Sequence, residues 1–326
     1  MKSKKILIIR NDHIGDLVLS THLFKEIKKK LPNSEISIVV SRLNKPLIEK
    51  DKSIDSIIEL GIPKYSLKTI WNFLKMSFWI RKKKFDIGID LRGSLMNAGF
   101  LLYLSGIKER ISRSDFHRGI SFFLTKPINP SFQDHIIKEN LEIINQGLNI
   151  HSHNYWPEIL TDKGDEKEVK EFLKKKKVKK YVCICPIAGS KARQWQLSNF
   201  KRLIKDLGKR QLDILVMGVS KDKHQLEELA KANKRCKIVL NFNLRQMSIL
   251  FKKSIFVLAQ DGGPMHIAWV SGARLLALFP RFPEGMKKIV PLKNSIVFVT
   301  KNKTMDSIQF EEVESAVYNI LKNAHI

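Results

Sequence analysis

Short apolar runs alternate with stretches of helical periodicity along the chain, and this alternation constrains the fold more than any other feature. In the first half the apolar runs are ILIIR (6–10), EISIVV (35–40), SIIEL (56–60) and FDIGIDL (85–91). Helical stretches separate them near 17–30, 43–51, 66–83 and 94–105. Strands that are apolar throughout and are joined by helices are typical of a parallel sheet covered on both faces.

The second half of the chain repeats this scheme. Its apolar runs are YVCICP (181–186), DILVMG (213–218), KIVL (237–240), SIFVLAQ (254–260), RLLALF (274–279) and SIVFVT (295–300). A length of 326 residues suits two domains. We therefore predict two doubly wound, Rossmann-like α/β domains, 1–160 and 161–326, with a cleft between them. The last helix, expected at 309–323, could pack back on the first domain.

Doubly wound sheets bind ligands beyond the carboxyl ends of their strands, so the loops after strands are the places to look for chemistry. The first such loop contains Asp12, His13, Gly15 and Asp16. We expect Gly15 to permit a tight turn and Asp16 to stand at the start of a helix. Asp16 is then either a first-turn carboxylate favoured by the helix dipole or a general base, with Asp12 and His13 as competitors for a role in binding or proton transfer.

Two loops of the second half carry the pattern of an anion site. After YVCICP, the segment PIAGSKARQW offers small residues whose amides could approach an anion, and it adds the donors Ser190, Lys191 and Arg193. After SIFVLAQ, the segment DGGPMH places paired glycines and a proline at a helix start, which favours a diphosphate site that needs no metal. The candidate residues of that segment are Asp261, Gly262, Gly263 and His266. Asp261 could accept the amides of the loop or act in catalysis, and His266 could contact the same phosphates or be buried and hydrogen-bonded.

A weaker candidate is Asp222, which follows the DILVMG strand. An acidic residue there could accept hydrogen bonds from ribose hydroxyls, or it could cap the next helix. The absence of GxGxxG after the first strand argues against a nicotinamide-dependent dehydrogenase.

The chain is strongly basic, with 59 Lys and Arg against 32 Asp and Glu and a formal net charge of +27. Such a charge indicates either a solvated surface or attraction to a polyanion: nucleic acid, acidic phospholipid or an anionic glycolipid. Only three cysteines occur, scattered as in proteins of a reducing compartment. No segment is long and apolar enough to cross a bilayer, so a cytoplasmic location is expected.

These segments together resemble the heptosyltransferase family of bacterial glycosyltransferases, family 9. The residues that carry the resemblance are ILIIRNDHIGDLVLS, PIAGSKARQW and DGGPMHIAWVSGARLLALF. The last contains the family's Asp-x-Gly-Pro-x-His pattern, and the first its Arg-x-x-x-x-Gly-Asp pattern. The resemblance implies the two-domain GT-B fold, with an acceptor-binding first domain and a nucleotide-sugar-binding second domain. It also implies an inverting, metal-independent transfer of a heptose or related sugar, without a cofactor.

Residue by residue, the resemblance makes Asp16 the general base. It places Arg193 where the family has the lysine of a Lys-x-Trp motif, and Asp222 at the donor's ribose. It makes the 261–266 segment the diphosphate loop. The implied partners are an ADP-heptose donor and an anionic lipopolysaccharide core at the cytoplasmic face of the inner membrane, where the protein could bind peripherally. Lys75, Arg81 and Lys82, which lie near aromatic residues, are candidates for that contact.

The sequence departs from the family at two places, Arg193 and the segment PRFPE after Phe279. Two alternatives therefore stay open beside transfer to a lipopolysaccharide core. One is a nucleic-acid-binding protein on a Rossmann-like scaffold, supported by the net charge but by no recognised nucleic-acid motif, so that nucleic acid is not the expected partner. The other is a catalytically silent relative that binds a nucleotide sugar.

Overall fold

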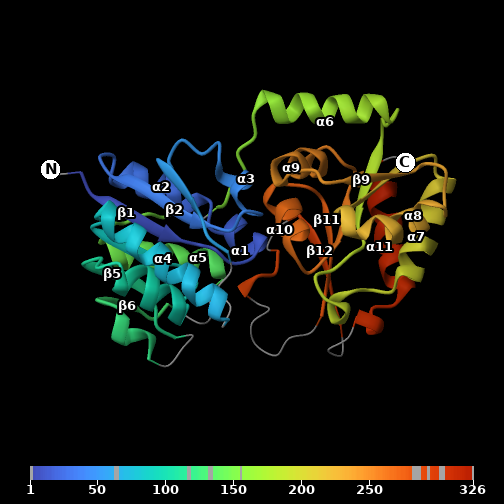
Figure 1. Ribbon diagram of the computed structural model, residues 1–326. Coiled ribbons are helices and arrows are strands. Elements are labelled where there is room, and N and C mark those ends of the chain that lie inside the picture. Colours follow the sequence, from blue (N-terminus) through green and yellow to red (C-terminus); the bar gives the residue numbers. More distant parts are fainter. Residues whose placement is uncertain are drawn as a thin grey trace. The chain divides into compact units, whose positions relative to one another are not determined.

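The chain forms two compact units, Met1–Glu158 and Ile159–Ile326, in each of which helices pack on a parallel sheet (Figure 1). The computed structural model describes residues 3–61, 66–115, 119–130, 135–154, 156–280, 288–291, 294–300 and 305–324. The α/β class predicted from the sequence is confirmed in both units. Within the ranges that the structure describes, every helix is too short or too polar to span a bilayer.

Six parallel strands form the sheet of the first unit in the order β3-β2-β1-β4-β5-β6. They are β1 (Lys5–Ile9), β2 (Glu35–Val40), β3 (Ser56–Glu59), β4 (Ile87–Asp90), β5 (Glu109–Arg113) and β6 (Lys126–Ile128). The central strand β1 pairs with both β2 and β4. The strand order therefore reverses between β1 and β4, which makes their carboxyl ends the position where a doubly wound sheet binds ligands.

The helices of the first unit cover its sheet. They are α1 (Ile14–Val18), α2 (His22–Lys30), α3 (Lys45–Ile48), α4 (Leu67–Lys83) and α5 (Ile136–Leu148), with the π-helix η1 (Asn97–Leu104) and the 3₁₀ turn η2 (Ile120–Phe123). On one face, Leu7 and Ile9 of β1 join a buried cluster with Phe73 and Ile80 of α4. The segment predicted as an ordinary helix at 94–105 contains the π-helix, a difference that apolar periodicity does not reveal.

The single helix expected at 17–30 is instead two helices, α1 and α2, with a break at residues 19–21. Side-chain hydroxyls bind the carbonyls of α1 at this break: Ser20 Oγ donates to Asp16 O at 2.7 Å and Thr21 Oγ1 to Val18 O at 3.0 Å. Such local bonds compete with the helical ladder, which explains an interruption that hydrophobic periodicity does not predict.

The second unit has six parallel strands in the order β12-β11-β10-β7-β8-β9. They are β7 (Tyr181–Cys185), β8 (Asp213–Gly218), β9 (Cys236–Leu240), β10 (Val257–Gln260), β11 (Leu275–Phe279) and β12 (Ser295–Val299). All six were predicted from the apolar runs. Here the order reverses between β7 and β10, which pair directly, so the carboxyl ends of these two strands are the equivalent ligand position.

The helices of the second unit include the last helix of the chain. They are α6 (Lys163–Lys175), α7 (Leu197–Lys209), α8 (Lys223–Ala230), α9 (Leu244–Lys252), α10 (Gly263–Val270) and α11 (Phe310–Asn323), with the 3₁₀ turns η3 (Lys191–Arg193), η4 (Ser220–Asp222) and η6 (Met305–Ser307). The buried side chains Val313, Val317 and Leu321 of α11 lie in the same cluster as Trp195 and Phe200. The last helix therefore packs in the core of its own unit.

Candidate functional site

The loop after β1 gathers charged side chains around the buried guanidinium of Arg10. Its Nη1 donates to the carbonyl of Leu91 at 2.8 Å, so it links the loop to the chain just after β4. The same guanidinium pairs with Asp12 at 3.4 Å and with Asp16 at 3.8 Å. Because Arg10 is only 3% exposed, it is a fixed charge that holds two carboxylates at the carboxyl end of β1.

The two carboxylates on Arg10 lie in different environments. The Asp16 side chain is 34% exposed and belongs to the first turn of α1, whereas Asp12 is buried. Burial raises the pKa of Asp12 to about 7, although the positive charge of Arg10 opposes the rise. Among the described residues, Oδ1 of Asp12 has no hydrogen-bond partner. Asp16 is therefore the carboxylate of this pair that a ligand in solution can reach.

His13 and Gly15 differ in how far they match the sequence prediction. His13 is exposed and directly precedes α1 as its N-cap residue. Gly15 lies inside α1 and is not among the glycines with positive φ. The prediction of a tight turn at Gly15 is therefore wrong, because Gly15 is helical and the loop reaches α1 without a left-handed residue at this position.

A second buried polar group at this edge was missed by the sequence analysis. Asp90, at the end of β4, accepts hydrogen bonds from Ser94 N at 2.8 Å and from Asn97 Nδ2 at 2.9 Å. Asn97 Nδ2 also lies 3.2 Å from Oδ1 of Asn11, in the loop after β1. Burial raises the pKa of Asp90, while these donors oppose the rise. The signal in the sequence was the second carboxylate of the run FDIGIDL, which stands directly before the last residue of the run.

In the second unit, Gln260 holds the two predicted phosphate loops together. It ends β10, and its Nε2 donates to Pro186 O at 2.8 Å, while its Oε1 accepts from Trp195 N. Trp195 is buried, and its Nε1 donates to Ile308 O at 2.9 Å. Phe200 of α7 lies edge-on to the indole, so Trp195 packs against the helix that follows it. The 186–195 segment is thereby fixed at both ends.

Arg193 pairs with Asp261 between these two loops. Its Nη1 lies 3.2 Å from Oδ2 of Asp261, and the exposed fractions are 46% for the arginine side chain and 5% for the aspartate. The sequence analysis expected Asp261 either to accept loop amides or to act in catalysis. The structure shows that Asp261 holds an arginine whose side chain still reaches solvent. Ser190 and Lys191 are exposed on the same loop.

The helix start predicted near Pro264 is confirmed, because α10 begins at Gly263 with Gly262 as its N-cap residue. The amides of a first helical turn have no acceptor within the helix, and the helix dipole adds partial positive charge there. His266, one turn further along, is buried at 5% exposure. The start of α10 and the Arg193 side chain thus combine two features that bind anions.

Asp222 is the N-cap residue of α8, but its side chain makes no capping hydrogen bond to that helix. Its Oδ2 accepts a hydrogen bond from Val219 N at 3.1 Å at the end of η4, directly before α8. Both η4 and the loop before it follow β8, the neighbour of β7 in the sheet. Of the segment PRFPE that departs from the family pattern after Phe279, residues 281–284 lie outside the described residues.

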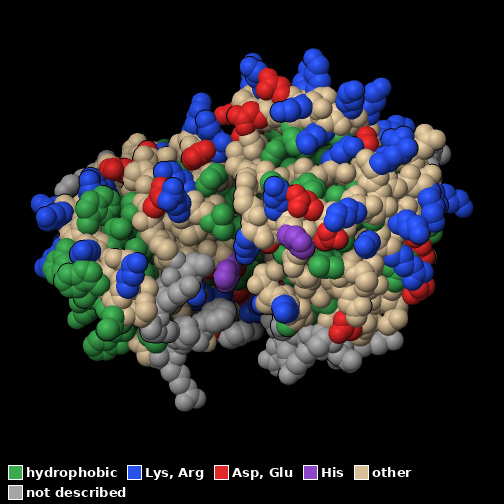
Figure 2. Space-filling view, turned by 45° about the vertical axis from the view of Figure 1, so that its right-hand side comes forward, with side chains coloured by type: hydrophobic (Ala, Val, Ile, Leu, Met, Phe, Trp, Pro, Cys, Tyr) green, Lys and Arg blue, Asp and Glu red, His purple; other side chains and the backbone are tan. Residues whose placement is uncertain are grey.

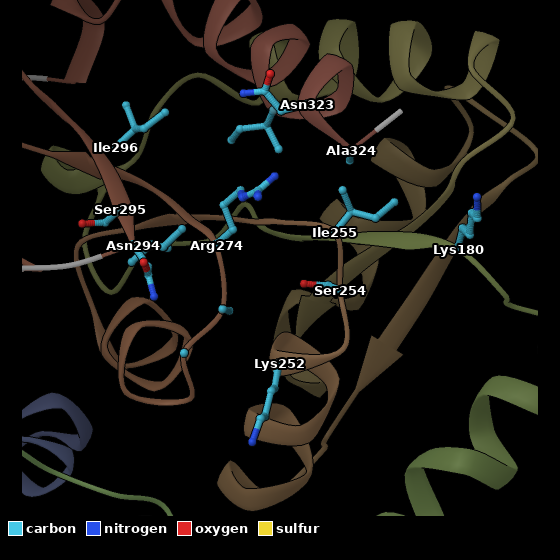
Figure 3. Close-up of a pocket in the computed structure, with 14 residues that line it drawn as sticks. Lys180, Lys252, Ser254, Ile255, Arg274, Asn294, Ser295, Ile296, Asn323 and Ala324 are labelled. Atoms are coloured by element: carbon cyan, nitrogen blue, oxygen red, sulfur yellow. The ribbon is translucent and has the colours of Figure 1, made fainter. Parts of the chain in front are cut away.

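A pocket of about 830 Å³ lies at the opposite edge of the second unit, where the strands begin. It is lined by Lys180, Arg274 and Asn294, which directly precede β7, β11 and β12, by Ser254 in the segment before β10, and by the end of α11 (Figure 3). This pocket is separate from the loops that follow β7 and β10. Among the residues that the structure describes, no cluster of His, Cys, Asp or Glu is arranged to hold a metal ion.

Comparison with known proteins agrees with this architecture. The chain is 22% identical to the lipopolysaccharide core heptosyltransferase OpsX of Haemophilus influenzae over 85% of this chain and 79% of the relative. It is similar in structure to a family 9 glycosyltransferase of Veillonella parvula, with a TM-score of 0.83, 19% identity and 98% of each chain covered. It is also similar to the Escherichia coli heptosyltransferase WaaC with ADP-2-deoxy-2-fluoro heptose, with a TM-score of 0.76, 14% identity and 97% and 99% coverage.

These structural likenesses show the fold, which is GT-B-like with two Rossmann-like units. The family model for glycosyltransferase family 9 (heptosyltransferase) matches residues 74–317, which is more than half of the chain. The chain therefore belongs to glycosyltransferase family 9, the heptosyltransferase family.

Proposed function

We propose that this protein is an inverting, metal-independent transferase that moves heptose, or a related sugar, from an ADP-sugar to a lipopolysaccharide core. The observation that carries this proposal is the pair of Arg193 and Asp261, which keeps a solvent-accessible cation beside the start of α10. A cation and helix amides at one place match the charge of a diphosphate leaving group.

The second unit is proposed to bind the donor. As the glycosidic bond breaks, negative charge grows on the leaving diphosphate. Arg193, Lys191 and the amides at Gly262 and Gly263 would stabilise that charge more in the transition state than in the ground state. Ser190 adds a hydroxyl donor to the same loop. The complex of Escherichia coli WaaC with ADP-2-deoxy-2-fluoro heptose supports an ADP-sugar as donor.

His266 and Asp222 are assigned secondary contacts with the donor. His266 is one turn from the start of α10, so its ring could bind the phosphates if it moves from its buried position. Asp222 is assigned to the donor's ribose. Its Oδ2 already accepts the Val219 amide, so a ribose hydroxyl would bind its other oxygen.

The first unit is proposed to bind the acceptor and to supply the general base. Asp16 is accessible and belongs to the first turn of α1. The Arg10 guanidinium stabilises this turn, because it contacts both the backbone carbonyl and the side-chain carboxylate of Asp16. Asp16 would accept the proton of the acceptor hydroxyl while that oxygen attacks the anomeric carbon from the face opposite the diphosphate. One direct displacement inverts the anomeric configuration. Asp12 and His13, beside Asp16 in the loop, are proposed to contact the acceptor.

The acceptor itself accounts for part of the basic charge of the chain. We propose that the lipopolysaccharide core presents phosphate and carboxylate groups at the cytoplasmic face of the inner membrane, where the protein acts from the cytoplasm. The net charge of +27 favours association with such an acceptor.

The test is transfer from ADP-heptose to a core oligosaccharide acceptor, followed by ADP release and by the anomeric configuration of the product, with and without a metal chelator. We expect acceptor-dependent ADP release that the chelator does not change, and inversion in the product. Thermal stabilisation by ADP-heptose without turnover would identify a silent relative. Tight duplex binding with a steep salt dependence and no effect of ADP-heptose would favour the nucleic-acid alternative.

A further inference from the structure

The outward face of α4 carries a row of large apolar side chains. Leu67, Trp71 and Phe78 are 87%, 59% and 64% exposed. Their spacing of four and seven residues places them on one side of the helix. The opposite side, with Phe73, Ser77 and Ile80, is buried against the unit. α4 is therefore apolar on its solvent side as well as on its core side. A surface helix whose outer side faces only water is normally polar there.

A row of lysines runs beside this apolar row. Lys68, Lys75 and Lys82 recur every seven residues, so they too share one side of α4. The segment LKTIWNFLKMSFWIRKKK (67–84) contains no Asp or Glu. Nζ of Lys75 lies 5.3 Å from the ring centroid of Trp71, so the two rows are in contact. We name these six residues, Leu67, Lys68, Trp71, Lys75, Phe78 and Lys82, the α4 surface.

The apolar character continues onto the neighbouring elements. Tyr103 of η1 lies next to Phe122 of η2, with ring centroids 6.3 Å apart, and the Phe122 side chain is 75% exposed. The π-helix η1 in turn packs against α4. Figure 2 shows hydrophobic side chains gathered at the left of the view with Lys and Arg side chains among them.

We propose that the α4 surface binds the surface of an anionic phospholipid bilayer, with α4 lying in the plane of the interface. Trp, Phe and Leu side chains would enter the boundary between headgroups and acyl chains, while the lysine row would bind anionic headgroups. A bilayer offers hydrocarbon and negative charge side by side, as the two rows require.

The charge pattern of α4 argues against the other occupants. A second copy of the chain would bring one lysine row close to another, without a carboxylate on the helix to offset it. Nucleic acid would satisfy the lysines but would leave Leu67 and Phe78 largely exposed, because a phosphate backbone offers little apolar surface.

The experiment measures flotation of the full chain with vesicles of phosphatidylcholine alone and of phosphatidylcholine with 30 mol% phosphatidylglycerol. We expect binding to the anionic vesicles that is at least tenfold tighter than binding to the neutral ones. The double variant W71A/F78A and the triple variant K68Q/K75Q/K82Q should each bind the anionic vesicles about tenfold more weakly or worse. All five side chains are exposed, so the fold should persist, which circular dichroism checks.

A matched control removes the same charge elsewhere. Lys170, Lys174 and Lys175 are exposed on α6, and K170Q/K174Q/K175Q should change vesicle binding less than twofold. The conservative variant W71F/W79F should retain binding but lose most of the vesicle-induced shift of tryptophan emission. Of the three tryptophans that remain, Trp195 and Trp269 are buried, and Trp156 is partly buried and lies outside α4.

Several results would overturn the proposal. These are a wild type that does not float with anionic vesicles, an equal loss in the α6 control, and unchanged binding in both α4 variants. A dimer in solution that W71A/F78A converts to monomer would assign the α4 surface to a second copy. A loss confined to duplex binding in K68Q/K75Q/K82Q would assign it to nucleic acid. Flotation needs neither donor nor turnover, so its outcome is independent of the proposed transfer reaction.

Discussion

The Arg193 guanidinium lies 3.2 Å from the carboxylate of Asp261, and this pair connects the loop after β7 with the loop after β10. Asp261 is buried and Arg193 is half exposed. The carboxylate therefore orients the arginine without withdrawing it from solvent, and the adjacent start of α10 adds helix amides at the same place. A diphosphate arriving there would meet a preoriented cation.

Replacement of Arg193 should separate the need for charge from the need for arginine geometry. We expect R193A to lower kcat/KM for ADP-heptose by about 10²-fold or more, because a charge that stabilises the leaving group is lost. R193K restores a cation at the position where the family has lysine, so its loss should stay within about tenfold. ADP release at varied donor concentration measures both. Equal defects in R193A and R193K would contradict the assigned role.

Asp16 is the position that tests the general base. We expect D16N to lower kcat by about 10²-fold or more. The affinity for ADP, measured by thermal stabilisation, should change less than twofold. The control is E35Q, at the beginning of β2 and thus at the other end of the same sheet. Near-normal turnover in D16N would remove Asp16 from the mechanism.

The sequence predicted ten of the strands because each is a compact apolar run, and the structure shows which elements that signal cannot reveal. β5 (ERISR) carries charged residues at three of its positions, and β6 (KPI) is short and begins with a lysine, so neither forms such a run. The break between α1 and α2 depends on hydroxyls that bind local carbonyls, and hydrophobic periodicity does not respond to them.

The candidate site shows the same contrast. Small residues in loops after strands predicted anion sites at 186–195 and 260–266, because backbone chemistry there depends on local residues. The pairing of Arg193 with Asp261 and the clamp by Gln260 join residues that are far apart in the chain. Asp222 is a local case that the sequence analysis also missed, because its carboxylate binds the Val219 amide within η4 and does not cap α8.

Asp12 should make the stability of the first unit depend on pH. Burial raises its pKa from 3.8 to about 7, so between these values the folded chain keeps a proton that the unfolded chain has lost. The stability contributed by this proton is full below pH 4 and is lost as the pH rises through 7. D12N has no proton to lose, so the free energy of unfolding of the wild type relative to D12N should fall from pH 5 to pH 8. Urea unfolding at several pH values measures this, and a constant difference would contradict it.

Gln260 should couple stability to donor binding, because its amide bridges both predicted phosphate loops. Q260L keeps a similar volume but removes the donor to Pro186 O and the acceptor for Trp195 N. These buried backbone groups would then lack their partner, which costs about 1–3 kcal/mol for each unsatisfied group. The loss should appear in the free energy of unfolding and in weaker stabilisation by ADP-heptose. Q196L alters an exposed amide beside the same loop and is the control, expected to change the free energy of unfolding by less than about 0.5 kcal/mol. If Q260L lowered stability but left the affinity for ADP-heptose unchanged, the clamp would serve the fold alone and the loop position would not depend on it.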